Sequence, residues 1–197
     1  EKGLKKIFAV GGDGTVNEVA KSLINTEAIL GVVPIGSGNG FARHLRIPLG
    51  LKEAVRLLKR DKVAMVDYGL INKMPFFCTA GIGFDALVGN VFAKSHERGF
   101  ASYFKTTIKE YLRYQPQNYT LRDNGHVIEK EAFLITVANT SQYGNNAYIA
   151  PDADISDGLL NVTIISPFPK FLSPSFGIKL FSRKLSNSRY VEMFRIR

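Results

Sequence analysis

The chain has 197 residues, of which 45% are hydrophobic and 22% charged, so it can bury one large core or two small ones. No apolar run reaches the roughly 18 residues that span a bilayer. The single cysteine, Cys78, excludes an intrachain disulfide or a cysteine metal cluster and suits a reducing cytoplasm. The net charge of +9 favours anionic partners, but the basic residues are spread along the chain, so we expect no nucleic-acid partner.

The first elements alternate between strand and helix. Residues 6–10 form a short apolar run that predicts a strand. Apolar residues then recur at helical spacing, at Val16, Val19, Ala20, Leu23 and Ile24. Thr15 and Glu18 have the spacing of a capping box, so we expect this helix to begin at Thr15.

The same alternation continues to about residue 60. Residues 28–35 predict a buried strand, residues 36–40 a glycine-rich turn, and Leu51, Ala54, Val55 and Leu58 a second helix. Strands that alternate with helices indicate a parallel sheet with helices packed on it.

The pattern changes near Asp67 and Tyr68, where we place a boundary between residues 1–67 and 68–197. Beyond it, strand signals come in pairs, with tight turns expected at Asn72–Lys73 and at residues 123–125. Residues 160–164 alternate as in a half-buried strand, and residues 190–196 predict a closing strand. One helix, from about Phe100 to Leu112, interrupts a region that is otherwise mainly antiparallel β.

The strongest local signal is the stretch Gly-Gly-Asp-Gly-Thr at residues 11–15, between a strand and a helix. Glycines let the backbone approach a ligand closely, and the amides of a helix N-terminus form an anion site that suits phosphate. Asp13 would repel phosphate unless it helps to hold Mg²⁺ or bonds a hydroxyl. A tight turn without a ligand is the alternative. The stretch is neither a Walker A loop nor a Rossmann fingerprint.

Other polar residues are less informative. Asp152, Asp154 and Asp157 lie close together before a strand, which suits either a hard cation or ordinary turn chemistry. The histidines at positions 44, 96 and 126 lack metal-ligand spacing, so we interpret each as a surface or loop residue.

Four motifs in order resemble the bacterial diacylglycerol kinase-like lipid kinases. Residues 11–15 are similar to the nucleotide loop shared with sphingosine kinases, NAD kinases and phosphofructokinases. Residues 34–43 (PIGSGNGFAR) resemble the second turn of the lipid kinases, and residues 80–86 and 150–160 resemble two motifs of their second domain. The resemblance implies an α/β nucleotide-binding domain followed by a mainly antiparallel β-sandwich domain, with the active site between them.

The resemblance also implies roles for individual residues. It places Asp13 in the catalytic centre and implies ATP and Mg²⁺ as cofactors. It implies a nucleotide site lined by Gly12, Asp13, Gly14, Thr15, Val16, Asn17, Glu18 and, on the facing turn, Ser37. Asp67 would join Asp13 around the catalytic Mg²⁺, while Asp157 and the carbonyls of Asp154 and Leu159 would hold a structural Mg²⁺.

The sequence departs from the family pattern in three places. Gly40 stands where many members have an aspartate of the metal network. The strand, turn and helix that open the family would precede Glu1, and the proposed general base, a glutamate, would follow Arg197. Asp85 is a candidate substitute for this base, although we interpret it as a structural residue. We therefore expect the 197-residue chain alone to have little or no kinase activity.

The resulting hypothesis is an ATP- and Mg²⁺-dependent kinase of diacylglycerol or a related lipid alcohol. The protein would be cytoplasmic and would meet its lipid substrate by peripheral contact with the inner membrane surface. The hypothesis leaves open whether it forms a homodimer. The alternatives are an NAD kinase-like enzyme and a non-catalytic nucleotide- or lipid-binding protein.

Overall fold

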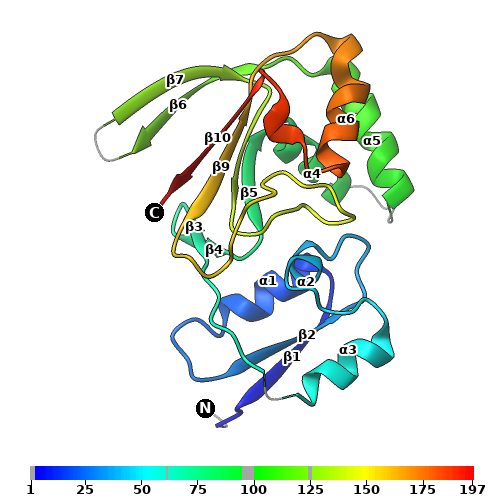
Figure 1. Cartoon of the computed structure of the whole chain (residues 1–197), viewed down its shortest axis with the longest axis vertical. Coiled ribbons are helices and arrows are strands. Elements are labelled where there is room, and N and C mark those ends of the chain that lie inside the picture. The colour runs from blue at the N-terminus through cyan, green and yellow to red at the C-terminus, as the bar shows by residue number, and fades with distance from the viewer. Residues whose placement is uncertain (1–2, 61, 95–99, 124–125) are drawn as a thin grey trace.

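The computed structural model describes residues 3–60, 62–94, 100–123 and 126–197, and they form two lobes (Figure 1). The smaller lobe holds the N-terminal elements, which are β1 (Lys6–Gly11), α1 (Asp13–Lys21), β2 (Ile29–Pro34), α2 (Gly40–His44) and α3 (Leu51–Leu58). β1 and β2 pair in parallel, with Lys6 opposite Ile29. The predicted strand–helix alternation is thus confirmed.

The helix α1 begins earlier than we predicted. Its N-cap is Gly12 and no side chain caps it, so Thr15 lies in its first turn and the predicted capping box is wrong. The backbone is already helical at Asp13, whose carboxylate is directed to the second glycine turn and not to its own helix. Val16 and Ala20 still face the core, as their spacing predicted.

The larger lobe is built on a four-stranded antiparallel sheet of order β10-β9-β8-β5. Its strands are β5 (Thr79–Gly83), β8 (Leu134–Ala138), β9 (Leu160–Ile165) and β10 (Val191–Ile196). Two hairpins accompany it, β3 (Gly69–Ile71) with β4 (Met74–Phe76) and β6 (Gln117–Asp123) with β7 (His126–Ala132). The α/β domain followed by mainly antiparallel β structure is therefore as predicted.

Of the two tight turns that we predicted between paired strands, one lies among the described residues. Asn72 and Lys73 join β3 to β4 with φ angles of 49° and 66°, which confirms the tight hairpin expected there. Residues 124 and 125 of the other expected turn lie outside the described residues, but the strands on either side of them pair.

Among the described residues of the larger lobe there are three α-helices and not one. They are α4 (Phe84–Lys94), α5 (Phe100–Arg113) and α6 (Ser173–Phe181), with short 3₁₀ turns η1 (Lys170–Leu172) and η2 (Leu185–Asn187) on either side of α6. The helix α6 contains Pro174 and Gly177, which weaken its helical signal. The apolar residues of α4 do recur at helical spacing, a pattern that we did not use, at Phe84, Leu87, Val88, Val91 and Phe92. The longest described helix, α5, has 14 residues, and none of the described helices has the length and hydropathy needed to cross a bilayer.

The strand β9 is buried on both faces, so the half-buried strand we predicted is wrong. Asn161 and Thr163 are 9% and 0% exposed, although they alternate with Val162 and Ile164. The segment between β8 and β9 crosses over this face, and Thr163 donates a hydrogen bond to the carbonyl of Ile149 in it (2.8 Å). Thr163 can be buried here because the covering backbone accepts its hydroxyl, whereas Nδ2 of Asn161 has no partner among the described residues.

Candidate functional site

The two glycine turns lie against each other at the ends of β1 and β2. A Cβ on Gly36 would lie 2.4 Å from the Cα of Gly12, so glycine is required for this contact. Gly14 and Thr15 are exposed on the next turn, and a Cβ on Gly14 would meet no atom within 4 Å. The start of α1 is therefore uncrowded at Gly14, and the free amides of a helix N-terminus suit an anion.

The second turn is closed by Asn39. Its side chain accepts a hydrogen bond from the amide of Gly36 (3.0 Å) and donates one to the carbonyl of the same residue (2.7 Å). An aspartate could not make both bonds, because the second needs an N–H donor. Asn39 has a φ of 52°, and it turns the chain into α2. Ser37 is exposed on this turn.

The carboxylate of Asp13 joins the two turns. Its Oδ2 accepts the amide of Gly40 and its Oδ1 the amide of Phe41, both at 2.9 Å. Asp13 thus caps α2 from a position 27 residues away in the chain. The carboxylate of Asp13 is thus bonded directly by amides of the second turn.

The thiol of Cys78 completes the surroundings of Asp13. It lies 3.8 Å from Oδ1 of Asp13. Burial, followed by the negative charge and the hydrogen bond of Asp13, raises the pKa of the Cys78 thiol, so the thiol stays protonated and can donate to the carboxylate.

The remaining residues predicted for the nucleotide site take different positions. Val16 is 2% exposed in the core, so only its backbone can face a ligand. Oδ1 of Asn17 accepts the amide of Phe77 (3.3 Å) and ties α1 to the larger lobe. Glu18 is exposed and pairs with Lys21 (2.9 Å), as surface pairs on helices commonly do.

A loop of the larger lobe, residues 142–147, packs on the second turn; we call it the asparagine loop. Asn39 and Gly144 form an isolated antiparallel bridge, and the amide of Asn145 donates to the carbonyl of Gly38 (3.1 Å). Gly144, Asn145 and Asn146 have φ angles of 116°, 49° and 64°, which fold the loop tightly. The segment that contains it lies at the junction, facing α1 and α2 (Figure 1).

Gly40 lets this loop come close. A Cβ at Gly40 would lie 2.8 Å from the carbonyl oxygen of Gln142 and 3.1 Å from the amide nitrogen of Gly144. A Cβ at Gly144 would lie 2.7 Å from the backbone of Gly38. The glycine at position 40 therefore has a structural reason in this chain, because an aspartate there would collide with backbone.

Arg43 and His44 fasten the same junction. Nε of Arg43 donates to the carbonyl of Gly38 (3.0 Å), and its terminal nitrogens lie 3.4 Å from the side-chain oxygens of Asn145 and Asn146. Nδ1 of His44 accepts the amide of Ser141 (3.1 Å). Burial lowers the pKa of His44, only partly opposed by Asp154, and favours the neutral acceptor. We interpreted His44 as a surface or loop residue, but it is the last residue of α2 and lies half-buried at the junction.

Asp67 lies beside residues 154–159, which we call the acidic segment. Its Oδ2 accepts the amide of Gly158 (2.7 Å), and its own amide donates to the carbonyl of Ile155 (2.7 Å). Nδ2 of Asn139 donates to the carbonyls of Asp67 (2.7 Å) and Phe77 (3.0 Å) and so joins this region to the segment before β5. The structure thus brings Asp67 into contact with the acidic segment.

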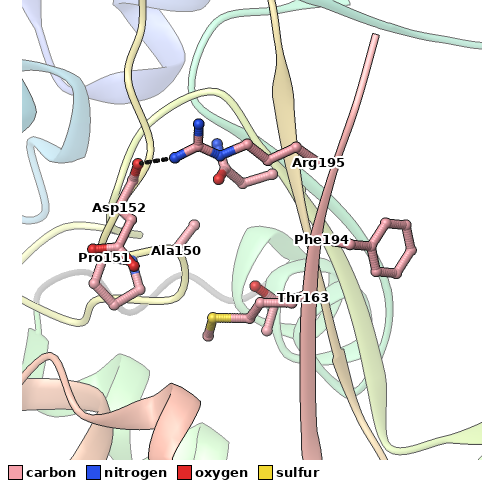
Figure 2. Close-up of a pocket in the computed structure, with 8 residues that line it drawn as sticks. Ala150, Pro151, Asp152, Thr163, Phe194 and Arg195 are labelled. Carbon is pink, nitrogen blue, oxygen red and sulfur yellow. Dashed lines mark hydrogen bonds between the residues drawn. The ribbon is translucent and has the colours of Figure 1, made fainter.

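The carboxylates of the acidic segment make turn contacts of their own. Oδ1 of Asp154 accepts the hydroxyl (2.8 Å) and amide (3.0 Å) of Ser156, which lower the pKa of Asp154. Oδ1 of Asp157 accepts the amide of Leu159 (3.0 Å). Arg195 reaches from β10 to Oδ2 of Asp157 (3.5 Å) and to the carbonyl of Asp152 (3.3 Å). Figure 2 shows this second contact at the mouth of a pocket of about 160 Å³, with Phe194 directed to the other side of the strand.

The residues around the two glycine turns fit the phosphates of a nucleotide better than they fit Mg²⁺. The open first turn of α1 suits the phosphates of a nucleotide. For Mg²⁺ the carboxylates of Asp13 and Asp67 and the carbonyls of residues 154–159 offer oxygen ligands, which this cation prefers. Oδ1 of Asp67 receives no hydrogen bond from a described residue. Three or more acidic, histidine or cysteine side chains do not converge as a metal site anywhere in the described chain, so backbone oxygens or phosphate would have to complete the shell.

Asp85 takes the structural position that we expected. It lies in the first turn of α4 and accepts hydrogen bonds from the hydroxyls of Thr136 (2.9 Å) and Tyr143 (3.1 Å) and from the amide of Ala86 (2.8 Å). Burial raises the pKa of Asp85, although these three bonds act in the opposite direction. Its oxygens are occupied within the larger lobe, which does not favour a role as the base.

Sequence reasoning missed the junction residues. Arg43 was read only as part of a motif, and His44, Asn139 and the asparagine loop were not assigned roles. The dipeptide Asn145–Asn146 after Gly144 is a turn signal that could have marked the loop. Its partner 100 residues earlier could not be inferred from spacing.

Two family descriptions match the chain. Residues 1–71 match the diacylglycerol kinase catalytic domain, and residues 78–195 match the YegS C-terminal NAD kinase beta sandwich-like domain. The second match covers more than half of the chain. The chain therefore belongs to the YegS-type, diacylglycerol kinase-like lipid kinase family.

Curated relatives agree with this assignment. The protein named "Probable lipid kinase YegS-like" of Chromohalobacter salexigens is 33% identical over 174 residues, which are 85% of this chain and 56% of the relative. The "Probable lipid kinase YegS" of an Escherichia coli strain is 30% identical over 171 residues, 83% of this chain and 57% of that protein. The chain thus spans a little over half the length of these relatives.

Solved structures share the fold. A diacylglycerol kinase from Bacillus anthracis has a TM-score of 0.69 and 24% identity, and the match covers 98% of this chain and 63% of that one. Two further structures from that organism give a TM-score of 0.76 each. The division of the chain at Asp67 and Tyr68 stays a prediction.

Proposed function

We propose that the protein transfers the γ-phosphoryl group of ATP to the hydroxyl of diacylglycerol or a related lipid alcohol, with Mg²⁺ as cofactor. The observation that carries the proposal is the pair of glycine turns in backbone contact, joined by the Asp13 carboxylate and open above Gly14. Such an arrangement offers amides to a polyphosphate and a carboxylate beside it. Phosphoryl transfer depends mainly on positioning and on stabilising negative charge, which this geometry suits.

The proposed roles follow from the positions of the side chains. The amides of Gly14 and Thr15 bind phosphate, and the hydroxyl of Ser37 approaches it from the facing turn. Asp13 and Asp67 hold Mg²⁺, which neutralises charge on the transferred group when bound. Asp157, with the carbonyls of Asp154 and Leu159, holds the second ion. The larger lobe presents the lipid hydroxyl, and we assign the general base to no residue of this chain.

The test is transfer of label from γ-labelled ATP in mixed micelles that contain diacylglycerol. We expect a longer form, of the length of the curated relatives, to label the lipid. We expect the 197-residue chain to bind Mg²⁺–ATP in calorimetry with little or no transfer. Absence of Mg²⁺–ATP binding by both forms would refute the proposal.

The same assay separates the alternatives. Label on NAD alone would identify an NAD kinase-like enzyme. Binding of nucleotide or lipid by the longer form without transfer to either acceptor would identify a non-catalytic binding protein. Robust turnover by the 197-residue chain would show that it contains the base after all.

A further inference from the structure

Large apolar side chains are exposed on one side of the larger lobe, over α5, η1 and α6. We call this surface the α5–α6 face, and its apolar members are Ile108, Leu112, Phe171, Ile178 and Phe181. Phe171 is 79% exposed and Ile178 is 70% exposed. Figure 1 shows α5 and α6 together at the outer edge of that lobe. Exposed apolar groups that gather in this way mark an interaction surface.

The α5–α6 face is assembled by internal contacts. Nζ of Lys170 donates to the carbonyl of Leu112 (3.0 Å), and the hydroxyl of Tyr111 lies 3.4 Å from the carbonyl of Lys170, so α5 is bound to η1. On the inner side of α6, Phe176 stacks on Phe168 with ring centroids 4.0 Å apart. Inward aromatic packing therefore fixes α6, and its outer side chains remain in solvent.

The charge of the α5–α6 face is almost entirely positive. Between Asp157 and Glu192 the chain contains five basic residues and no acidic one, namely Lys170, Lys179, Arg183, Lys184 and Arg189. The outer side of α5 adds exposed Lys105, Lys109 and Arg113, and Glu110 is the acidic residue of that helix. Apolar side chains among basic ones match an anionic membrane surface, which attracts Lys and Arg while apolar groups enter the acyl boundary.

A groove of about 440 Å³ between α6 and η2 lies beside these residues. Lys179 and Arg189 line it together with the rings of Phe176 and Tyr190. The guanidinium of Arg189 lies over the Tyr190 ring, 4.8 Å from its centroid, and donates to the Tyr190 hydroxyl (2.7 Å). A cation held in this way is placed to bind a phosphate.

We propose that the α5–α6 face docks on a bilayer that contains anionic phospholipid, with a headgroup phosphate in the groove between α6 and η2. The proposal rests on the proposed function in one respect, since a kinase of membrane lipids must meet its acceptor at a bilayer. The apolar side chains enter the acyl boundary, and the basic side chains lie at the level of the headgroups.

The test is sedimentation of the chain with vesicles of phosphatidylcholine alone and of phosphatidylcholine mixed with phosphatidylglycerol, without nucleotide. We expect binding to the mixed vesicles that weakens with added salt. Phe171→Ser and Ile178→Ser should each weaken partitioning by about tenfold, because each removes an inserted apolar side chain. Lys109→Gln and Lys184→Gln should each weaken it by about fivefold.

A matched control is Met65→Ser in the smaller lobe. Met65 is 87% exposed, so its replacement removes a comparable apolar surface outside the α5–α6 face and should leave partitioning unchanged. Near-wild-type circular dichroism of each variant shows that it is folded. Equal losses for Met65→Ser and Ile178→Ser, or equal binding to both vesicle types, would overturn the proposal.

Two other occupants of the α5–α6 face are outcomes of the same series. If light scattering shows a dimer of the wild type that Ile178→Ser dissociates, and vesicles do not bind, the face is an interface between two copies. Transfer to a short-chain, water-soluble diacylglycerol by the longer form, without vesicle binding, would overturn the docking proposal alone. Vesicle binding without Mg²⁺–ATP binding would overturn the proposed function alone.

Discussion

Replacing Gly40 by alanine should separate the two lobes locally. The added methyl group would lie 2.8 Å from the carbonyl oxygen of Gln142 and 3.1 Å from the amide nitrogen of Gly144. Both neighbours are backbone atoms in a tightly folded loop, so they cannot move as a flexible side chain does. Overpacking of this kind costs about 1–3 kcal/mol. The conformational gain of alanine over glycine offsets only about 0.5–1 kcal/mol of that.

Urea titrations should therefore give Gly40→Ala a free energy of unfolding lower than that of the wild type by a net amount of up to about 2.5 kcal/mol. Gly89→Ala is the matched control, because Gly89 is exposed in α4 and a Cβ there meets no atom within 4 Å. That variant should gain about 0.5–1 kcal/mol. If Gly40→Ala were as stable as Gly89→Ala, the close approach of the asparagine loop would be refuted.

Three further changes test the junction and the turns. Arg43→Met should speed hydrogen exchange at the Asn145 amide and lower the free energy of unfolding by about 1–3 kcal/mol, because the bonds of Arg43 are lost. The control Arg56→Met, at an exposed position of α3, should change neither quantity. Equal exchange rates in the two variants would contradict the role of Arg43. Asp13→Asn should lower the free energy of unfolding by about 1–3 kcal/mol, because the new NH₂ group would face a backbone N–H. In the longer form it should also abolish Mg²⁺-dependent phosphoryl transfer, which an assay with labelled ATP measures. Because burial lowers the pKa of His44 below its unfolded value of about 6.5, the unfolded chain binds more protons just below that pH, so stability should fall as pH drops through 6.5. In urea titrations from pH 5 to 8, His44→Asn should flatten this slope, and an unchanged slope would contradict the assignment.

The sequence predicted the elements whose cause is local. Periodicity predicted β1, β2, α3 and α5, and the Asn72–Lys73 dipeptide predicted the hairpin between β3 and β4, because that turn needs positive φ angles from its own residues. The apolar residues of α4 have a helical period, but the helix was missed because its first residues were interpreted only as part of a family motif. The burial of Asn161 was missed because alternation along a strand does not show that the loop before it folds back over its polar face.

The candidate site was predicted only in part, for a related reason. Glycine spacing indicated the first turn, but the direction of the Asp13 carboxylate depends on two amides that lie 27 and 28 residues further along. The part played by Gly40 depends on the asparagine loop, about 100 residues away. Local pattern can locate a turn, whereas the partner of a side chain is decided by how the two lobes meet.

The thiol of Cys78 has a practical consequence for studying this protein. It is the only cysteine in the sequence, and it lies against Asp13 where the two lobes join. Because its thiolate is disfavoured there, alkylating reagents should modify it slowly until the lobes part. The rate of labelling at this natural sulfur atom would then report separation of the two lobes without any engineered probe, and a ligand that holds the lobes together should slow it.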